Sequence, residues 1–272
     1  MAQIGNHTNL PIEEDLVRHM VLNKIRQIRK KFSDCGEIVI ACDGRNTWRR
    51  QMFQYYKANR KIDRSKSDFD WHAIYEILNK IKDELRDNFP YIVIHVEGAE
   101  ADDVIASLVN KYGVEINTDT SDKIVIVSGD KDFVQLQRFA NVEQYDPIKS
   151  RSIVENDPYK FVKMHIIKGD RGDGIPNILS DDNCLVSGVR QKKITEKFID
   201  NFNYDQQPEQ IQRNYMRNFS LIDLSQVPIT IQLQSLATYD VEKKTSPARK
   251  QKMFNYFVNK RLKNLMECIG EF

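Results

Sequence analysis

A run of four β-branched apolar residues, followed at once by two carboxylates, constrains the fold of this chain more than any other stretch. Ile124 to Val127 are all apolar and have polar residues on either side. Such a run is typical of a strand that is buried on both faces of a parallel sheet. Asp130 and Asp132 follow where the strand would end, the edge at which open α/β sheets bind their ligands. Two acids this close repel each other unless a cation lies between them, so a divalent metal is expected if further carboxylates converge here.

Up to about residue 150, segments of strand type alternate with segments of helix type. The expected strands are 37–43, 91–95, 124–127 and 142–145, and the expected helices are 14–32, 48–60, 70–88, 104–112 and a short one at 133–136. Asp70 is the expected N-cap of its helix, and residues 61–69 have no periodicity and are expected to be a mobile loop. The alternation predicts an α/β domain over residues 1–150, with a mostly parallel central sheet flanked by helices.

Beyond residue 150 the strand signal fades. The segments 157–168, 190–202, 208–219 and 248–266 are all better helices than strands. Residues 151–272 are therefore predicted to form a mainly helical region.

Composition narrows the function classes. The chain has 272 residues, 40% of them hydrophobic and 29% charged, which is typical of a soluble globular protein. Its apolar runs are far shorter than the ~20 residues that span a bilayer, and its polar start does not resemble a signal peptide. A cytoplasmic protein without membrane contact is expected, in the host cell if the chain is viral. The widely spaced cysteines make a zinc site improbable.

The net charge of +2 conceals two basic segments. Residues 45–66 carry eight basic side chains and one acid, and residues 243–263 carry eight and none. Concentrated positive charge indicates a polyanionic partner. For 243–263, and for Arg45 and Arg64, a solvated surface is an equally good interpretation.

Acids recur at each place where an α/β fold builds a site. They are Asp43, Glu100 with Asp102 and Asp103, Asp130 with Asp132, and Asp170 with Asp173. Each group alone has an ordinary explanation as a turn residue, a helix cap or a neighbour of turn glycines. Four such coincidences together favour a shared site for Mg²⁺ or Mn²⁺, which prefer oxygen ligands. Two ions clamping a phosphodiester would use this many carboxylates.

The same residues carry a family resemblance. In order they are Asp43, Trp48-Arg49-Arg50, Tyr55-Tyr56-Lys57-x-Asn59-Arg60, Glu100-Ala-Asp102-Asp103, Ser128-Gly-Asp130-x-Asp132-Phe133 and Gly169-Asp170-x-x-Asp173-x-Ile175-Pro176. From about residue 14 to the end, the chain resembles the 5′ nuclease (flap endonuclease) superfamily. Within it the chain is similar to the replication ribonucleases H of T-even-type bacteriophages, also in its ending Ile269-Gly-Glu-Phe272.

The resemblance implies a fold, an activity and a metal site. The fold is a PIN-like nuclease core with a helical arch at about 45–70 and a helix-hairpin-helix-type DNA-binding segment in the C-terminal region. The activity is removal of RNA primers and flaps from the 5′ end with two Mg²⁺ ions, for which Mn²⁺ can substitute. Asp43, Glu100, Asp102 and Asp130 match ligands of the first ion, Asp132 and Asp173 match ligands of the second, and Asp170 supports them. Asp103 matches a helix-opening acid beside the site.

Basic and glycine residues match the nucleic-acid contacts of the family. Lys57 and Arg60 match residues that touch the scissile phosphate, and the one-sided basic face of the expected helix 48–60 gives them an independent rationale. Tyr55 and Tyr56 are expected to pack in the core or arch and not to stack on bases. Further contacts are expected from Arg49, Arg50, Lys61, Gly169, Gly172, Gly174 and Ile175. The segment 169–179 would grip duplex backbone through main-chain amides, and a K⁺ ion there is common among relatives.

The chain departs from the family at its beginning. Relatives start with a strand that carries an Asp of the first metal cluster, whereas here polar residues 1–7 lead towards the helix at 14–32. Glu13, Glu14 and Asp15 are explained by helix capping and not promoted to ligands. A missing strand would leave neighbouring backbone groups unpaired, so weak or no activity of this chain is expected.

A Mg²⁺-dependent 5′ to 3′ exonuclease and flap endonuclease is the main hypothesis. Its partners would be flapped, nicked or forked DNA, RNA–DNA hybrids and replication proteins such as a single-stranded DNA-binding protein or a sliding clamp, and the chain would be a monomer. A DNA-binding replication accessory without catalysis is the first alternative, and a toxin-type ribonuclease is the second. The intact Asp130, Asp132 and Asp173 argue against the first. The arch-like basic helix 48–60 and the segment Gly169-Asp-x-x-Asp173 argue against the second.

Overall fold

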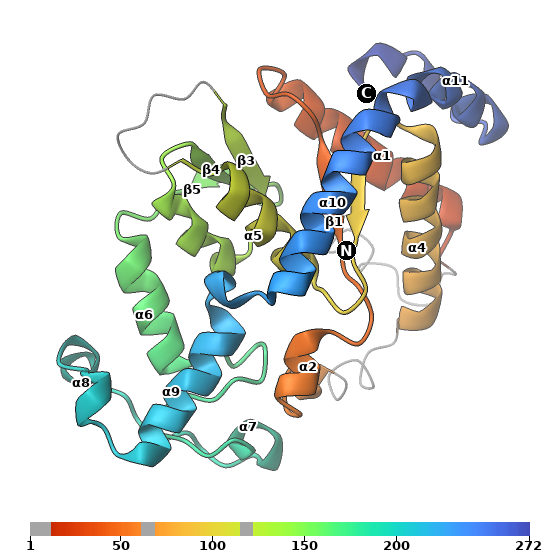
Figure 1. The fold of residues 1–272 in the computed structure, drawn as a ribbon. Helices are drawn as coiled ribbons and strands as arrows, with labels where there is room; N and C mark the ends of the chain where they lie inside the picture. Colours follow the sequence, from red (N-terminus) through yellow and green to blue (C-terminus); the bar gives the residue numbers. More distant parts are fainter. Residues whose placement is uncertain (1–11, 61–68, 115–121) are drawn as a thin grey trace. The chain divides into compact units, whose positions relative to one another are not determined.

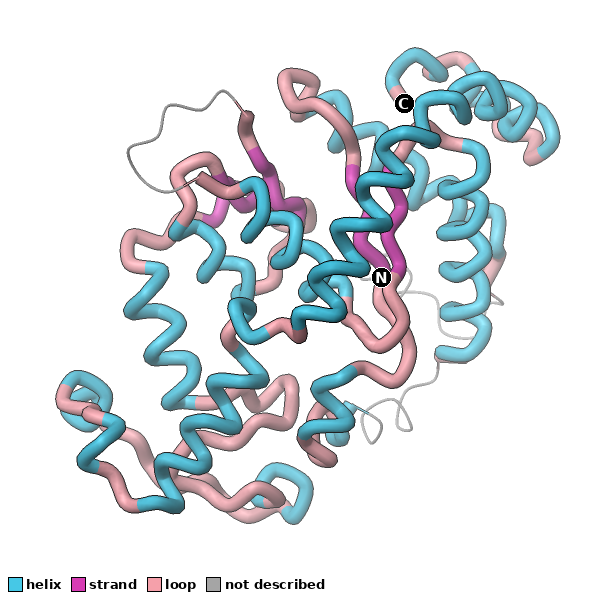
Figure 2. Tube along the Cα trace, in the orientation of Figure 1, coloured by secondary structure: helices cyan, strands magenta, loops and turns pink. Residues whose placement is uncertain are grey.

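The computed structural model describes residues 12–60, 69–114 and 122–272, which contain helices and short strands (Figures 1 and 2). These residues form two compact units. The first unit is built from the described parts of Met1–Ile40, Lys66–Ile94 and Thr238–Phe272, and the second from those of Ala41–Ser65 and His95–Ala237. The predicted division at about residue 150 stays a prediction. The expectation that no strand precedes the first helix concerns residues 1–11, which lie outside the described residues, so the expected loss of activity also stays a prediction.

The first unit is built on helices around an aromatic core. Its helices are α1 (Glu14–Lys31), α4 (Trp71–Asn88), the end of α10 (Ile229–Thr245), η4 (Ser246–Arg249), α11 (Lys250–Asn259), α12 (Lys263–Met266) and η5 (Ile269–Glu271). Strands β1 (Val39–Cys42) and β2 (Ile92–His95) pair with each other, and they begin in this unit and end in the second. Asp70 caps α4 by accepting the N–H of Ala73 at 3.0 Å, as predicted. The helix ends before Phe89, whose fully buried ring packs edge-on against Tyr256 and Phe257. Burial of several large aromatic side chains thus anchors the C-terminal helices in this unit.

The basic segment 243–263 makes ion pairs within the first unit. Lys243 pairs with Glu37 at 3.3 Å, and Arg249 pairs with Glu242 at 2.8 Å. Lys260 pairs at 2.6 Å with Glu84. Part of this charge is therefore balanced by neighbouring acids, which makes the segment less of a free cationic surface than its composition indicates.

The second unit combines a small sheet with helices. Its elements are α2 (Trp48–Met52), α5 (Ala101–Tyr112), β3 (Ile124–Val127), η1 (Lys131–Arg138), β4 (Val142–Asp146), β5 (Arg151–Ile153), α6 (Pro158–Lys168), α7 (Cys184–Ser187), α8 (Glu196–Asp200), η2 (Tyr204–Gln206), α9 (Glu209–Ile222), η3 (Leu224–Gln226) and the start of α10. The sheet has the order β3–β4–β5, with Ile126 paired to Gln144 in the parallel ladder and Tyr145 to Ser152 in the antiparallel one. The α/β class is confirmed, and hydrogen bonding distributes the strands over two small sheets.

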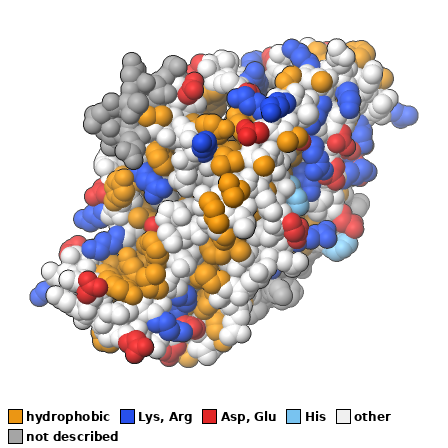
Figure 3. All heavy atoms as spheres, viewed as in Figure 1, with side chains coloured by type: hydrophobic (Ala, Val, Ile, Leu, Met, Phe, Trp, Pro, Cys, Tyr) orange, Lys and Arg blue, Asp and Glu red, His pale blue; other side chains and the backbone are white. Residues whose placement is uncertain are grey.

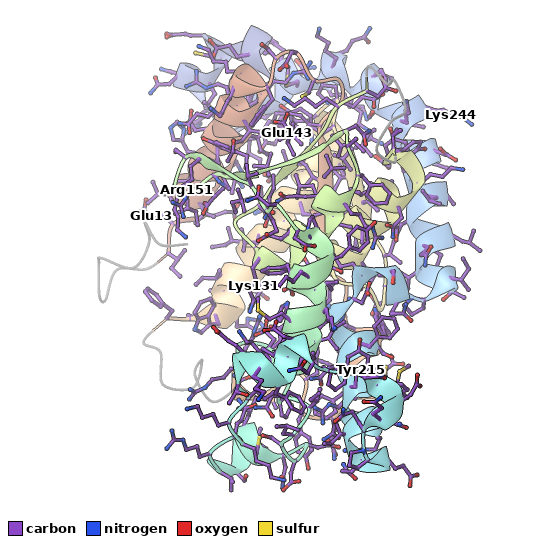
Figure 4. All side chains as sticks on the ribbon, turned by 90° about the vertical axis from the view of Figure 1, so that its left-hand side faces the viewer. Glu13, Lys131, Glu143, Arg151, Tyr215 and Lys244 are labelled. Atoms are coloured by element: carbon purple, nitrogen blue, oxygen red, sulfur yellow. The ribbon has the colours of Figure 1, made fainter. Side chains whose placement is uncertain are left out.

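In this unit, α6 packs against both η1 and α9. Helices α6 and α9 are labelled in Figure 1. Tyr215 of α9, labelled in Figure 4, stacks on Phe202 with ring centroids 5.2 Å apart and lies 5.5 Å from the ring of Tyr204. Figure 3 shows hydrophobic side chains gathered over α6 and α9. This packing positions the end of α6, from which the 170–173 acids follow.

Three expectations about single elements are corrected. The strand 124–127 is not buried on both faces, because only Ile126 is buried and Val127 is 36% exposed. Among the described residues it lies at an edge of its sheet. The predicted helix 190–202 is confined to α8, which begins only where Thr195 caps it. The predicted helix 248–266 breaks at Arg261, whose φ of +55° is incompatible with helix.

The helix α10 is an element that the sequence reading missed. Its residue Ile231 is buried, whereas Ile229 and Leu233 are 64% and 59% exposed. Apolar residues therefore occur on more than one side of the helix and give no single stripe for a pattern to detect.

None of the described helices combines the length and the apolarity that crossing a membrane requires.

Candidate active site

Helix starts hold most of the predicted acids. Glu100 is the N-cap of α5, and Asp102 lies in the first turn of that helix. Asp130 caps η1 by accepting the N–H of Asp132 at 3.0 Å. The positive end of a helix favours carboxylates, which is why these acids are tolerated so close together.

A small cavity in the second unit brings acids from three separate segments together. Asp102, Asp132, Asp170 and Asp173 all line it, and the remaining lining residues are Arg49, Tyr56, Ile175, Leu221, Ile222 and Leu224. The acids come from α5, η1 and the turn after α6, which are far apart in the sequence. The structure thus gathers them at one position.

Glu100 lies at the centre of a set of hydrogen-bond donors. The Nζ of Lys57 donates to its Oε1 at 2.6 Å, and the hydroxyl of Tyr56 donates to its Oε2 at 2.7 Å. The buried guanidinium of Arg49 donates to the same Oε2 at 3.2 Å. Burial alone would raise the pKa of Glu100, but Lys57 and the other donors outweigh it and lower that pKa. Glu100 is therefore ionised at neutral pH.

The acids of the cavity repel one another. Burial raises the pKa of Asp102 to about 7, and the neighbouring Asp130 carboxylate adds to the rise. Burial also raises the pKa of Asp132 to about 6, and Asp130 adds to this rise while His165 opposes it. A nearby cation would stabilise the ionised forms of Asp102 and Asp132 and lower their pKa values. The Oδ1 of Asp132 is buried and accepts no hydrogen bond, so it is available to a cation.

Asp170 differs from Asp102 and Asp132 because donors occupy both of its oxygens. Its Oδ1 accepts the N–H groups of Gly172 at 2.8 Å and Asp173 at 3.2 Å. Its Oδ2 lies 3.1 Å from His165 Nε2 and 2.8 Å from the Nζ of Lys131, which lies beside α6 in Figure 4. Burial would raise the pKa of Asp170, but the bonds from His165 and Lys131 hold it well below its usual range.

The turn after α2 packs onto the segment that carries Asp170 and Asp173. Phe53 and Tyr56 are buried in one cluster with Ile175. The N–H of Lys57 donates to the carbonyl of Asp173 at 2.7 Å. The predicted helix 48–60 is therefore wrong as a single helix. It is interrupted at Phe53, which is extended, and Lys57 has a φ of +54°.

Because the helix is interrupted at Phe53, the side chains of Lys57 and Arg60 both reach Asp173. Lys57 Nζ lies 3.7 Å from its Oδ2, and Arg60 forms an ion pair with its Oδ1. The hydroxyl of Tyr56 lies 3.2 Å from Oδ2. The buried position of Tyr56 agrees with its expected role in packing and adds a donor role that was not foreseen.

Asp43 and Asp103 lie at the start of α5 with capping partners. Asp43 accepts the N–H of Ala101 at 2.9 Å. Asp103 is fully buried and accepts from the N–H of Glu100, from Trp48 Nε1 and from Arg49 Nη1. Asp103 thus holds the helix start, as expected of a helix-opening acid.

The predicted nucleic-acid contacts are corrected in part. Arg49 is 2% exposed, with its guanidinium on Glu100, on Asp103 and on the carbonyl of Leu221, so it is not available to a phosphate. The amides of 169, 172, 174 and 175 all donate within the protein, to His165, Asp170 and Arg171, which leaves none of them to grip a backbone. Ile175 is buried. Arg50 is exposed, and Lys61 lies outside the described residues.

His165 and Lys131 are site residues that the sequence reading missed. Neither residue belongs to a motif of its own, and Lys168 and Arg171 lie nearer to the 170–173 acids in the sequence than His165 does. A search for basic residues within five positions of each acid would have found both, because Lys131 separates Asp130 from Asp132 and His165 precedes Asp170 by five.

Comparison with known families covers residues 6–272. Residues 6–164 match the family described as 5′-3′ exonuclease, N-terminal resolvase-like domain, and residues 160–272 match the one described as T4 RNase H, C terminal. The chain belongs to the 5′-3′ exonuclease family. It is therefore a nuclease, an enzyme that hydrolyses phosphodiester bonds.

Individual members of this exonuclease family agree with the assignment. The chain is 31% identical to the ribonuclease H of Enterobacteria phage T4, over 97% of this chain and 90% of that protein. It is 30% identical to a 5′-3′ exonuclease of Buchnera aphidicola, over 58% of this chain and 54% of that protein.

Solved structures of the exonuclease fold also match. The phage T5 D15 protein, co-crystallised with metal ions, covers 85% of this chain and 92% of its own with a TM-score of 0.59 and 18% identity. A phage T5 D15 flap endonuclease in complex with DNA and metal ions matches with a TM-score of 0.57 and 19% identity, over 89% and 93% of the two chains. At this identity the likeness concerns the fold.

Proposed function

We propose that this exonuclease acts as a structure-specific 5′ nuclease that removes flaps and RNA primers with two Mg²⁺ ions, in the setting of phage DNA replication. The observation that carries the proposal is the cavity lined by Asp102, Asp132, Asp170 and Asp173. The matched ribonuclease H of phage T4 and the flap endonuclease of phage T5 support the substrate class.

The donor chemistry of the cavity fits a hard divalent ion. Asp102 and Asp132 have raised pKa values of about 7 and about 6, so a cation bound there would relieve their repulsion. The unpaired Oδ1 of Asp132 offers a ligand atom without breaking a protein hydrogen bond. We assign Asp43, Glu100, Asp102 and Asp130 to a first ion and Asp132 with Asp173 to a second. Bound metal ions supply an activated water and neutralise charge on the leaving oxygen.

Lys57 and Arg60 have a role on the substrate side. Both are held at carboxylates of the site, Lys57 on Glu100 and Arg60 on Asp173. An entering phosphate would compete for these cations, because it offers more negative charge at the same position. We assign them to orient the scissile phosphate and to offset the charge that develops on it. Tyr56 and Arg49 hold the Glu100 carboxylate in position by donating hydrogen bonds to its Oε2.

Further partners follow from the proposed substrate. Arg50 is exposed and is assigned to the nucleic-acid backbone. Flapped, nicked or forked DNA and RNA–DNA hybrids are the proposed substrates, with Mn²⁺ as a substitute metal and a K⁺ ion at the segment after α6. A replication partner such as a single-stranded DNA-binding protein or a sliding clamp, and a monomeric state, belong to the same proposal.

Cleavage of a 5′-labelled flap separates this function from that of a DNA-binding accessory. The full chain is incubated with Mg²⁺ and either a flapped duplex or an RNA–DNA hybrid, beside Asp132→Asn and a matched control, Asp205→Asn. Asp205 is an exposed acid of η2, outside the cavity. We expect short 5′ products from the wild type and from Asp205→Asn, formed slowly if the weak activity predicted for this chain holds. Asp132→Asn should lose about 10³-fold or more of the wild-type rate. Binding of the flap without metal-dependent products from any of the three proteins would favour the accessory.

A further inference from the structure

His165 lies between two acids of the site and is buried almost completely. Its side chain is 7% exposed and comes from the last turn of α6. Its Nε2 lies 3.1 Å from Asp170 Oδ2, and its Nδ1 lies 3.4 Å from Asp132 Oδ1. One ligand atom from each of these three residues can be chosen so that all lie within 4.8 Å of one another.

The two ring nitrogens of His165 have different environments. Nε2 is within hydrogen-bond distance of Asp170 Oδ2, and this carboxylate also pairs with the Lys131 ammonium and accepts two backbone N–H groups. An ionised carboxylate only accepts, so Nε2 carries the proton and donates it. Nδ1 makes no hydrogen bond although it is buried, and the same is true of Asp132 Oδ1 in front of it. In the neutral imidazole, Nδ1 then presents a lone pair towards an unpaired carboxylate oxygen.

Two buried acceptors that face each other are unfavourable unless a shared positive group lies between them. A histidine whose far nitrogen is held by a carboxylate is the usual arrangement of a metal-bound imidazole. The 3.4 Å between Nδ1 and Oδ1 is also the spacing expected for two ligand atoms at about 2.1 Å from one ion with a near-tetrahedral angle between them.

We propose that His165 Nδ1 and Asp132 Oδ1 are ligands of one divalent ion, with Asp170 as the carboxylate that orients the imidazole. This inference rests on the proposed metal-dependent nuclease and changes the chemistry of its second metal position. Asp170 is not itself a ligand, because four donors already occupy its two oxygens.

A nitrogen ligand alters which ions this position prefers. Mg²⁺ favours an all-oxygen octahedral shell, whereas imidazole binds the later divalent transition ions well. The position is thus selective for ions of the class of Mn²⁺, Co²⁺ and Zn²⁺ over Mg²⁺. An all-carboxylate site would not show this selectivity to the same degree.

Pulsed electron paramagnetic resonance of bound Mn²⁺ tests the proposal without any cleavage reaction. The full chain is loaded with Mn²⁺ in the absence of nucleic acid, once with ordinary and once with ¹⁵N-labelled histidine. We expect modulation from a directly bound nitrogen, with its frequency changed by the label. Mn²⁺ that binds without nitrogen modulation would overturn the proposal, and this comparison needs no variant that must fold.

Two glutamine variants assign the nitrogen. His165→Gln should lose the modulation and bind Co²⁺ at least about tenfold more weakly, while its Mg²⁺ affinity changes by less than about twofold. His72→Gln is the matched control, because His72 is an exposed residue of α4 with an 83% exposed side chain. It should behave as the wild type in both measurements. Unchanged Co²⁺ affinity in His165→Gln, or an equal loss for Co²⁺ and Mg²⁺, would contradict the inference.

Failure of this inference and failure of the proposed function have different signatures. Nitrogen modulation together with an inactive wild type would keep the metal ligand and refute the nuclease function. Flap cleavage by the wild type but not by Asp132→Asn, without nitrogen modulation, would keep the nuclease and refute His165 as a ligand.

Discussion

At the scale of single residues, the site pairs some of its buried carboxylates with basic partners and leaves others without them. Glu100 is balanced by Lys57, and Asp170 by Lys131 and His165. Asp102 and Asp132 lack comparable partners and keep raised pKa values. Asp102 and Asp132 are thus the assigned ligands whose charge the protein balances least, whereas Glu100 and Asp173 are assigned to metal although basic side chains pair with them.

Lys57→Met tests the role of the lysine at Glu100. Removing the ammonium that lies 2.6 Å from Glu100 takes away the cation proposed to meet the scissile phosphate. We expect the cleavage rate at saturating Mg²⁺ and flap to fall by about 10²-fold, with little change in folding. Single-turnover kinetics measure the rate, and Lys197→Met, an exposed lysine of α8, is the control. A rate that stays within twofold of the wild type would exclude the proposed role.

Asp102→Asn tests the buried charge in the metal-free protein. The folded-state pKa of Asp102 is about 7 against an ordinary 3.8, so between these pH values the folded protein binds more protons than the unfolded chain. This group therefore lowers stability as pH rises through that window. In the presence of a chelator we expect the variant to melt at least about 4 °C above the wild type at pH 7.5. At pH 4 the two should melt within about 1 °C of each other, and an equal difference at both pH values would refute the assignment.

At the scale of elements, the turn after α2 and the segment after α6 depend on each other. Gly174 allows this contact because it has a φ of +72°, and a Cβ there would lie 2.6 Å from the carbonyl oxygen of Tyr55. Lys57 and Asn59 donate to carbonyls of the same segment. The basic residues thus reach the acids through backbone packing and not through the face of one continuous helix.

Gly174→Ala should disrupt this contact more than a simple change of glycine does. Gly188→Ala is the matched control, because Gly188 has a nearly equal φ of +73° but no atom within 4 Å of the added Cβ. The control should lose about 1 kcal/mol from the left-handed backbone alone. Gly174→Ala should lose at least about 2 kcal/mol, because the clash with Tyr55 adds to it. Urea unfolding measures both, and equal losses would show that the two segments do not press on each other.

At the scale of the whole molecule, all of the described acids that we assign to metal lie in the second unit. Asp43, Glu100 and the acids from 102 to 173 fall within its two segments, whereas α1, α4 and α11 belong to the first unit. Binding energy of a metal ion therefore acts directly on the second unit, since an ion that binds only the folded state stabilises what it contacts.

Hydrogen exchange followed by mass spectrometry tests this division. We expect saturating Mn²⁺ to slow exchange of the amides at 128–136 and 165–175 by at least about tenfold, and to leave α1 and α4 unchanged within twofold. In Asp132→Asn the protection at 128–136 should be lost. Equal protection throughout both units would show that the metal couples them into one cooperative body.

Features of this protein that depend on residues close together in the sequence could be predicted from the sequence alone. The strand at 124–127, the capping of α4 by Asp70 and the helix-opening role of Asp103 were predicted correctly, because each depends on residues within a few positions of one another. The four groups of acids were found for the same reason, since strand ends and helix starts have local signatures. That the four groups of acids converge in one site could be expected only because so many acids occur at such positions.

Tertiary structure decided what those residues contact. The break at Phe53, the burial of Arg49 and the saturation of Asp170 all depend on partners far along the chain. No periodicity could show them, because long-range packing overrode the helical tendency of 48–60. The strand that ends before Asp130 and Asp132 lies at a sheet edge within the part of the chain that the structure describes. The second of these acids, Asp132, faces His165, which no motif marks. Sequence determined which charges had to be neutralised, and only the fold determined which atoms remain open to a metal ion.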